Sequence, residues 1–169
     1  MKTLIIGGVA GGASCAARLR RLDEKAEIII LERGAFISFA NCGLPYYIGG
    51  EITEKSNLTL QTPESFKARF NIEVRTFSEA VAIDIENKTV TVRDLKTGEE
   101  YAEGYDSLVL SPGASSIRPR IDGIDSDKVF TLRNIPDTMK IKQYIEKSRP
   151  RSAVVVGGGY IGVEMAENL

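Results

Sequence analysis

The first 32 residues combine two short apolar runs with a helical pattern between them. Residues 3–6, "TLII", contain a short apolar run, and residues 28–31, "IIIL", form a second one that ends at Glu32. Between them, residues 13–22 place apolar side chains three and four positions apart. Short apolar runs on either side of a helical period predict a strand, a helix and a second parallel strand.

The helix of this unit has two faces of different character. Four apolar residues recur at i, i+4, i+7 and i+11, namely Cys15, Leu19, Leu22 and Ala26. They predict a buried stripe in which Cys15 is a small core residue. Ser14, Arg18 and Arg21 repeat at the same spacing about a third of a turn away. This stripe is either a solvated surface or a phosphate-binding face, because guanidinium groups pair with phosphate oxygens.

Later residues predict further sheet structure. From Glu79 onward, apolar and polar residues alternate, with turns at Glu86–Asn87 and Lys96–Gly98, which is typical of an antiparallel meander. The pattern runs into a buried strand, Ser107–Leu110, and a turn. The stretch "DTMKIKQYIEK", residues 137–147, has a helical period.

The turn after the first strand is rich in glycine. Gly7, Val9 and Gly12 occupy the first, third and sixth positions of a dinucleotide fingerprint, so its middle glycine is missing. In that fingerprint, glycines let the backbone approach a pyrophosphate at a helix N-terminus. Glu32 stands where an acidic residue would bind a ribose hydroxyl. By itself the motif indicates either a nucleotide site or an ordinary glycine-rich turn.

A second copy of the fingerprint favours the nucleotide interpretation. The segment "RSAVVVGGGYIGVEMAENL" predicts a strand at Ala153–Val156 and then a helix. Gly157, Gly159 and Gly162 lie between them in the strict spacing. Two such units predict two dinucleotides. Since the sequence stops within the second helix, we expect it to be an incomplete protein, without the residue that separates NAD from NADP.

Composition narrows the class of protein. The 169 residues include 22 basic and 23 acidic residues, no histidine and two cysteines. The balanced charge gives no reason to expect nucleic acid. Without histidine, a zinc site is not expected, and a Ser-His-Asp or Cys-His hydrolase is excluded within this chain. No apolar run approaches the roughly 18 residues that span a bilayer, and the N-terminus fits a signal peptide poorly, so a cytoplasmic location is predicted.

The segment "SFANCGLPYYIGG", residues 38–50, surrounds the second cysteine. Asn41 suits a helix cap and Pro45 suits a first helical turn, so a short helix is expected to begin here. A cysteine at a helix N-terminus has a stabilised thiolate and is a better nucleophile. Cys42 has no CxxC partner. If it reacts with a disulfide, it must therefore hold half of the substrate.

These motifs together resemble the pyridine nucleotide-disulfide oxidoreductase family. The similarity is to its single-cysteine branch of coenzyme A-disulfide reductases, NADH oxidases and persulfide reductases. Five segments in the family's order carry it: "GGVAGGASCAARLRRL", "SFANCGLPYYIGG", "YDSLVLSPGA", "TLRNIPDT" and "VVVGGGYIGVEMAENL". The resemblance implies an α/β fold, with a Rossmann-like FAD-binding domain at residues 1–115, containing a parallel sheet, helices and the antiparallel meander. A connecting segment at 116–150 and the truncated start of a Rossmann-like NAD(P)-binding domain at 151–169 follow.

The resemblance also implies site residues. FAD would be bound by Gly7, Gly8, Val9, Ala10, Gly11, Gly12, Glu32, Arg33, Val81, Ser111, Pro112, Gly113, Ala114 and Arg133, with the catalytic Cys42 against the flavin. NAD(P)H would be bound by Gly157, Gly159, Tyr160, Ile161, Gly162 and Glu164. Coenzyme A would be bound by Ser14, Arg18, Arg21, Ser38 and Asn41. No metal is implied.

The implied activity is reduction of coenzyme A disulfide or persulfide by NAD(P)H through Cys42, in a full-length homodimer completed by a C-terminal dimerisation domain. One alternative is an NADH oxidase or peroxidase in which the cysteine cycles through sulfenic acid. Oxidases and peroxidases of that kind carry histidine where this chain has Ala10. A further alternative is that residues 1–169 bind flavin without turnover.

Overall fold

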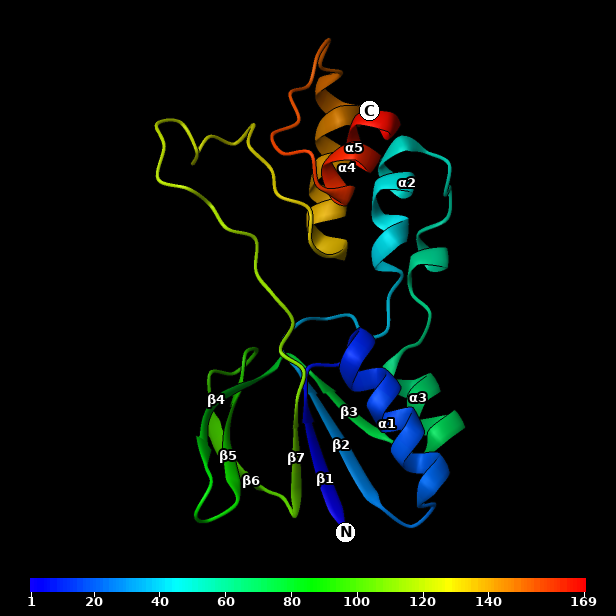
Figure 1. Ribbon diagram of the computed structural model, residues 1–169, viewed down its shortest axis with the longest axis vertical. Helices are drawn as coiled ribbons and strands as arrows, with labels where there is room; N and C mark the ends of the chain where they lie inside the picture. The colour runs from blue at the N-terminus through cyan, green and yellow to red at the C-terminus, as the bar shows by residue number, and fades with distance from the viewer. The chain divides into compact units, whose positions relative to one another are not determined.

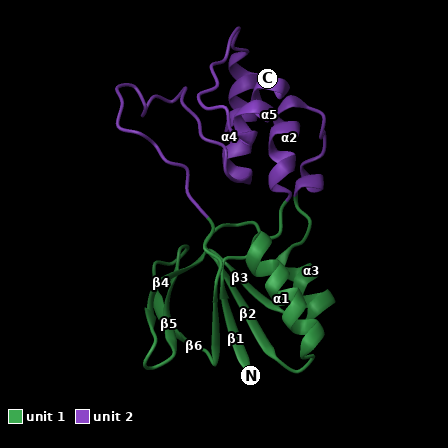
Figure 2. Cartoon of the chain, viewed as in Figure 1, with its two compact units in different colours: residues 1–39, 59–113 green, residues 40–58, 114–169 purple.

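The computed structural model describes residues 1–169, which form two compact units (Figure 2). Unit 1 comprises residues 1–39 and 59–113, and unit 2 comprises residues 40–58 and 114–169. The segment that contains Cys42 therefore belongs to unit 2, together with the second glycine fingerprint. The domain boundaries expected at residues 115 and 150 stay a prediction.

Unit 1 contains the predicted βαβ unit (Figure 1). Its parallel sheet has the order β3-β2-β1-β7 and is formed by Glu73–Thr76, Glu27–Glu32, Lys2–Ile6 and Ser107–Leu110, respectively. Helix α1, Ala10–Leu22, connects β1 to β2, and helix α3, Pro63–Phe70, precedes β3. The expected parallel sheet is confirmed. Strand β3 and helix α3 were not predicted, since each is short and β3 has no continuous apolar run.

Alternating side chains of the parallel strands face two separate cores. Ile5, Ile28 and Ile30 pack with Ala13 and Ala16 of α1 on one face. On the opposite face, neighbouring strand residues, Leu4, Ile29 and Leu31, pack against Val90 and Val92. Because both faces of the sheet are covered, its central strands β1 and β2 contain continuous apolar runs.

The second face is covered by an antiparallel meander (Figure 1). Its strands are β4, Ser78–Asp84, β5, Thr89–Asp94, and β6, Glu100–Gly104. The order is β4-β5-β6, and turns lie at the two predicted places. Gly98 in the second turn has a φ of 81°, a conformation that glycine adopts at little cost. The expected meander is confirmed.

Helix α1 buries a different face from the one predicted. Its buried residues are Gly12, Ala13, Ala16 and Arg20. Leu22 is 66% exposed and Cys15 is only half-buried, so the predicted stripe is wrong in part. The helix lies close to the strands through small residues, and this close approach favours alanine and glycine over leucine on the sheet-facing side.

Unit 2 is helical (Figure 2). A 3-10 turn at Asn41–Gly43 leads into α2, Leu44–Gly49, and a second 3-10 turn follows at Lys55–Leu58. The later elements are α4, Ile135–Ser148, and α5, Tyr160–Asn168. Ile48, Ile141 and Met165 form a core among the three helices. None of the helices in the structure combines the length and the apolar character needed to cross a membrane.

The strand predicted at Ala153–Val156 is not present. These residues belong to no strand, and Val154 and Val156 are 88% and 93% exposed. The apolar run suits a strand, but no strand of the chain pairs with it. Without a neighbour, its backbone N–H and C=O groups have no ladder to join.

Candidate nucleotide and thiol sites

The first glycine turn brings three backbone segments into direct contact. Gly7 has a φ of 98° and donates its N–H to the Leu31 carbonyl at 2.8 Å. A Cβ on Gly7 would lie 2.0 Å from the Ser111 carbonyl oxygen, and a Cβ on Gly12 would lie 1.8 Å from the Gly7 carbonyl oxygen. No larger residue fits either position. The turn therefore keeps the start of α1 close to the ends of β1 and β7.

This arrangement suits an anion at the N-terminus of α1. The helix begins at Ala10 after Val9, no side chain caps it, and its first turn has no acidic residue. The first N–H groups of a helix lack partners within the helix and carry partial positive charge. Pyrophosphate is the ligand that such glycine-rich helix starts bind in dinucleotide folds.

Glu32 is held at the carboxyl end of β2 beside this turn. One carboxylate oxygen accepts the Gly8 N–H at 2.8 Å and the other accepts the Gly34 N–H at 2.7 Å. The residue is only 9% exposed. A carboxylate oxygen has lone pairs beyond the one used here, so both oxygens retain acceptor capacity for ribose hydroxyls. The predicted acid is thus fixed at the edge of the glycine turn.

The other residues of unit 1 that are predicted to bind the nucleotide lie in loops or at a register shift in β4. Ser111 donates its N–H to the Ile6 carbonyl at 2.8 Å, and Gly113 has a φ of 72°. Val81 is 37% exposed and lies at a register shift between Ala80 and Ala82 in β4. No residue of β5 stands opposite Val81, and such bulges recur near binding sites. Pro112 and Arg33 are exposed.

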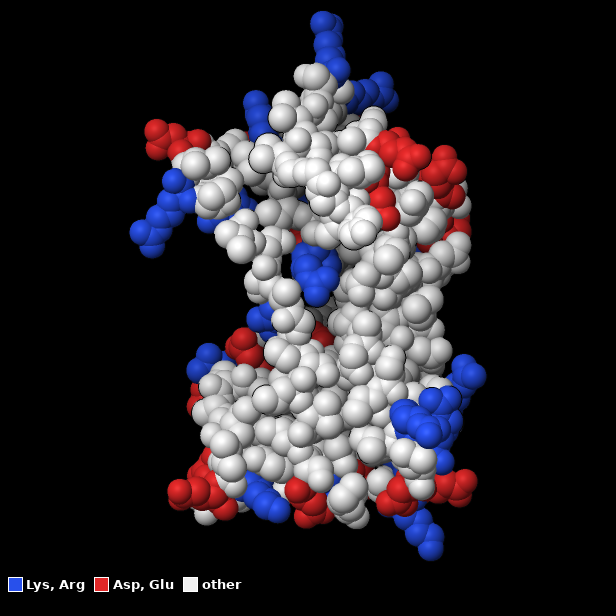
Figure 3. All heavy atoms as spheres, viewed as in Figure 1, with Lys and Arg blue, Asp and Glu red and all other residues white.

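Ser14, Arg18 and Arg21 are all exposed on α1. Figure 3 shows Lys and Arg side chains gathered on the surface over α1 and α3, and α3 contributes two exposed basic residues, Lys67 and Arg69. Three predicted substrate residues therefore share one solvent-facing surface, whose basic charge suits phosphate.

Ser38 adopts a backbone conformation that is uncommon for a serine. Its φ is 45°, in the left-handed region. Its N–H donates to the Gly8 carbonyl at 3.0 Å, and its carbonyl accepts the Leu60 N–H at 3.1 Å. These two bonds hold the strained residue beside the glycine turn. Strained residues that neighbouring bonds hold in place cluster at binding sites.

Cys42 is exposed and lies in the 3-10 turn of unit 2. The expected short helix is present, since α2 follows at Leu44 with Pro45 in its first turn. The predicted cap is wrong, because the Asn41 side chain makes no capping bond. Instead the Asn41 Oδ1 atom is buried without a hydrogen-bond partner. An unsatisfied buried acceptor is costly, so this atom is suited to a donor from a ligand.

The remaining predicted residues of unit 2 lie on its long connection and on α5. Arg133 donates from Nε to the Ala114 carbonyl at 3.1 Å, so it anchors the start of that connection. Gly157 has a φ of 108°, and a Cβ on Gly162 would lie 2.0 Å from the Gly157 carbonyl oxygen. The same close contact joins Gly7 and Gly12. The second fingerprint thus adopts the local turn of the first without its strand.

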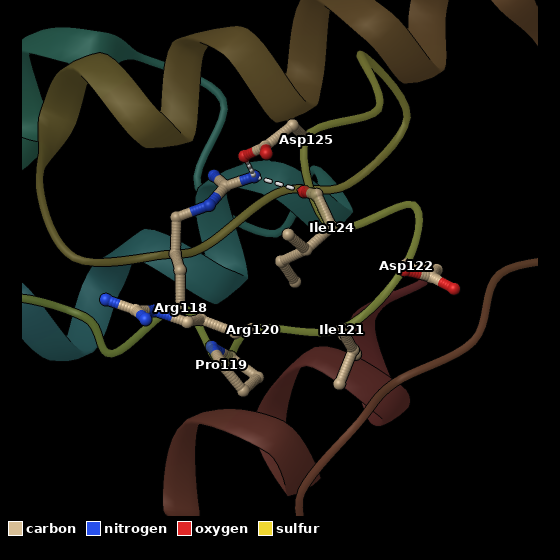
Figure 4. Close-up of a pocket in the computed structure, with 7 residues that line it drawn as sticks. All are labelled: Arg118, Pro119, Arg120, Ile121, Asp122, Ile124 and Asp125. Atoms are coloured by element: carbon tan, nitrogen blue, oxygen red, sulfur yellow. Dashed lines mark hydrogen bonds and ion pairs between the residues drawn. The ribbon is translucent and has the colours of Figure 1, made fainter.

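Unit 2 also contains a surface hollow that none of the predicted site residues lines (Figure 4). Its volume is about 420 Å³, and it is lined by residues 118–122, Ile124 and Asp125. Arg118 donates to the Ile124 carbonyl and lies 3.9 Å from the Asp125 carboxylate. The guanidinium therefore closes this loop on itself, and the hollow follows from the loop's curvature.

The two units divide the predicted site residues between them. The first glycine turn lies in unit 1 with Glu32, Arg33, Ser38, Val81, Ser111, Pro112, Gly113 and the α1 stripe. Unit 2 contains Asn41, Cys42, Ala114 and Arg133, together with Gly157, Gly159, Tyr160, Ile161, Gly162 and Glu164. Sequence reasoning missed Gly34, whose N–H holds Glu32. The glycine two residues after a strand-ending acid was the available indication.

The chain matches a family model over its whole length. The model describes the pyridine nucleotide-disulphide oxidoreductases and matches residues 1–169. The chain belongs to this family. The predicted family membership is therefore confirmed.

Similar proteins of this family include several of known structure. The chain is 46% identical to a coenzyme A disulfide reductase of Staphylococcus haemolyticus, over 99% of this chain and 38% of the relative. It is 59% identical to reduced Bacillus anthracis CoADR-RHD, with a TM-score of 0.96 over 99% of this chain and 30% of that one. An NAD-dependent persulfide reductase from A. fulgidus is 38% identical, with a TM-score of 0.94 over 99% and 32% of the two chains. The chain thus spans well under half the length of these family members.

Proposed function

We propose that this chain supplies the FAD-binding part and the reactive cysteine of an NAD(P)H-dependent oxidoreductase that reduces coenzyme A disulfide or coenzyme A persulfide. The observation that carries the proposal is the exposed Cys42, whose neighbour Asn41 has a buried acceptor without a partner. The similarity to a coenzyme A disulfide reductase supports this choice of substrate.

The residues of unit 1 fit FAD. The glycines of the Gly7–Gly12 turn bring its backbone against Ser111 and the start of α1 without side chains in between, and the uncapped start of α1 presents N–H groups to a pyrophosphate. Glu32 would accept the adenosine ribose hydroxyls, and the unpaired backbone at Val81 would reach the adenine. Gly8 to Gly11, Arg33 and Ser111 to Gly113 complete this proposed set, with Ala114 and Arg133 in unit 2. When bound, FAD would carry two electrons from an NAD(P)H hydride to a disulfide sulfur.

The residues proposed for coenzyme A match its chemistry. Coenzyme A has phosphate groups at one end and amides along its thiol arm. Arg18 and Arg21 would pair with phosphate, beside Ser14 and Ser38. Asn41 Oδ1 would accept an amide N–H from the thiol arm. For NAD(P)H, the Gly157–Gly162 fingerprint would bind the pyrophosphate, and Tyr160, Ile161 and Glu164 on α5 would also contact the cofactor.

Cys42 would act as the nucleophile. Its thiolate sulfur attacks one sulfur of coenzyme A disulfide, a Cys42–S–S–CoA bond forms, and one coenzyme A thiolate leaves. Two electrons then reduce this mixed disulfide, which releases the second coenzyme A thiolate and regenerates the Cys42 thiolate. Cys15 is half-buried and belongs to unit 1, so the proposal assigns it no part in this exchange.

Intact mass measurement and peptide mapping test the proposal. The purified protein is exposed to coenzyme A disulfide and measured with and without a reductant. We expect a reducible coenzyme A adduct on Cys42, which disappears in Cys42→Ser and persists in the matched variant Cys15→Ser. A sulfenic acid at Cys42 with no adduct would overturn the proposal and favour an NADH oxidase or peroxidase.

A further inference from the structure

Helix α2 follows the Cys42 turn directly, so its position determines where the cysteine lies. The helix has six residues, Leu44–Gly49. An isolated helix of this length is not stable in water, because nucleation costs more than so few hydrogen bonds return. The placement of α2 therefore depends on its neighbours in unit 2, which are α4 and α5.

Helix α4 holds the middle of α2 through apolar and polar contacts. Ile48 shares a buried cluster with Ile141 of α4 and Met165 of α5. Lys142 donates from Nζ to the Tyr47 carbonyl at 3.1 Å, and the same ammonium lies 5.0 Å from the centre of the Tyr47 ring. These contacts restrain the middle of α2.

The C-terminal end of α2 contacts Asn168 of α5. A Cβ on Gly49 would lie 2.7 Å from Asn168 Oδ1, 2.8 Å from the Asn168 backbone oxygen and 2.9 Å from Asn168 Cβ. No side chain fits at position 49 without displacement of one helix. Asn168 is itself oriented, because its Nδ2 donates to the Glu164 carbonyl at 2.8 Å.

Helix α5 thus connects the second glycine fingerprint with α2. Its first residues belong to the Gly157–Gly162 fingerprint, and Asn168 contacts Gly49. Nine helical residues span about 13 Å at 1.5 Å each, and a helix of that length moves as one body. A displacement at either end is therefore passed to the other.

We infer that Gly49 and Asn168 are positioning residues for Cys42, seating the Cys42 helix on the helix that carries the second glycine fingerprint. The inference rests on the proposed function for the role of Cys42 as nucleophile. The inference itself concerns only one contact: the reactivity of Cys42 depends on the contact between Gly49 and Asn168.

The substitution Gly49→Ala tests this contact. Alanine is the better helix former, so helix propensity alone would favour the variant. We expect the alkylation rate of Cys42 by iodoacetamide, mapped by peptide, to change about threefold or more, since small displacements alter reaction geometry strongly. Cys15 in unit 1 serves as the internal reference in each sample, and its rate stays unchanged. The control Gly104→Ala adds a Cβ that meets only the Lys88 backbone oxygen, at 4.0 Å.

The double variant Gly49→Ala/Asn168→Gly removes two of the three close atoms and brings the Cys42 rate back toward that of the unaltered protein. The inference would be overturned if folded Gly49→Ala had an unchanged Cys42 alkylation rate. It would also be overturned if the Cys42 rate of the double variant were no closer to that of the unaltered protein than the rate of Gly49→Ala. If Gly49→Ala does not fold, Asn168→Gly alone is expected to alter the alkylation rate of Cys42. An unaltered Cys42 rate in Asn168→Gly would then also overturn the inference.

A separate experiment distinguishes this inference from the proposed function. The unaltered protein is exposed to coenzyme A disulfide, and absence of an adduct overturns the proposed function. The iodoacetamide rates still decide whether Gly49 and Asn168 position Cys42.

Discussion

Arg20 and Arg21 are adjacent in the sequence and have opposite environments in unit 1. Arg20 is 9% exposed, whereas Arg21 is exposed. The Arg20 guanidinium donates to the carbonyls of Phe70 at 2.8 Å and Asn71 at 2.9 Å. It also donates to the Glu24 carbonyl at 2.6 Å. One side chain therefore satisfies carbonyls at the ends of both α1 and α3.

The substitution Arg20→Lys is expected to lower the free energy of unfolding by about 2–4 kcal/mol, because one ammonium cannot reach carbonyls on two helices and some are left unsatisfied. Urea denaturation measures the change. The neighbouring Arg21→Lys keeps an exposed charge and is expected to shift the same quantity by about 0.5 kcal/mol or less. Equal losses in the two variants would contradict the structural role of Arg20.

At the scale of elements, an ion-pair network joins the meander to the parallel sheet. Glu103 on β6 accepts hydrogen bonds from Lys2 of β1 and Arg75 of β3. Lys2 also pairs with Glu27 at 3.4 Å, and Arg75 pairs with Glu73 at 2.6 Å. Burial raises the pKa of Glu103, but the hydrogen bonds from Lys2 and Arg75 outweigh it, so the pKa lies below its ordinary value of 4.5.

The lowered pKa of Glu103 determines how the stability of unit 1 depends on pH. Because the folded-state pKa of Glu103 is below the unfolded one, the network stabilises unit 1 above about pH 4.5 and this stabilisation is lost as the pH falls through the folded-state value. We expect Glu103→Gln to reduce the free energy of unfolding by about 1–3 kcal/mol at pH 7, and the difference to shrink in acid. Denaturation at several pH values measures it. The control Glu86→Gln lies in an exposed turn, and an equal pH dependence there would argue against the network.

Elements differed in how far they could be predicted. Strands β1 and β2 and helix α4 follow from their periodicity, and the meander follows from alternation and its turn residues. Strand β3 has four residues with one apolar side chain, Val74, so no periodic pattern indicates it. Its pairing with β2 depends on register with a strand some 40 positions earlier, which a local pattern does not contain.

At the scale of the whole molecule, ligand binding links the proposed function to stability. A ligand that binds only the folded state stabilises it by about 2.7 kcal/mol at 100 times its Kd. We expect removal of FAD to lower the unfolding midpoint and its return to restore it. Calorimetry with and without added FAD measures the effect. A midpoint that does not depend on FAD would contradict the proposed cofactor.

The variant Glu32→Gln sharpens this test. The glutamine amide has an NH₂ donor in place of one carboxylate oxygen, so either the Gly8 N–H or the Gly34 N–H loses its acceptor. The hydrogen bonds that ribose hydroxyls donate to this side chain are also weakened. We expect FAD affinity to fall about tenfold or more, which reduces the FAD-dependent stabilisation. Glu24→Gln is the matched control, because this glutamate side chain is exposed and follows the C-terminal end of α1, whereas the glycine turn lies at its start.

For the candidate site, the sequence indicated the residue types and their local turns, but not the tertiary surroundings of these residues. The glycine positions, the strand-ending acid and the cysteine before Pro45 are local sequence features, and each stands at the predicted kind of turn or strand end. The unsatisfied Asn41 acceptor and the Gly49–Asn168 contact were not predictable from the sequence. They depend on which segments meet in unit 2, and position 168 lies more than a hundred residues from position 49.

The sequence by itself determined the first βαβ unit, the meander, helix α4, the two glycine turns and the membership of a redox family. These follow from local rules, since apolar periodicity and glycine's access to positive φ act over a few residues. Only the tertiary structure decided that α1 buries Arg20 and exposes Leu22, and that the apolar run at 153–156 has no partner strand. Burial and strand pairing are made with distant segments, so the same local pattern has different outcomes according to what packs against it.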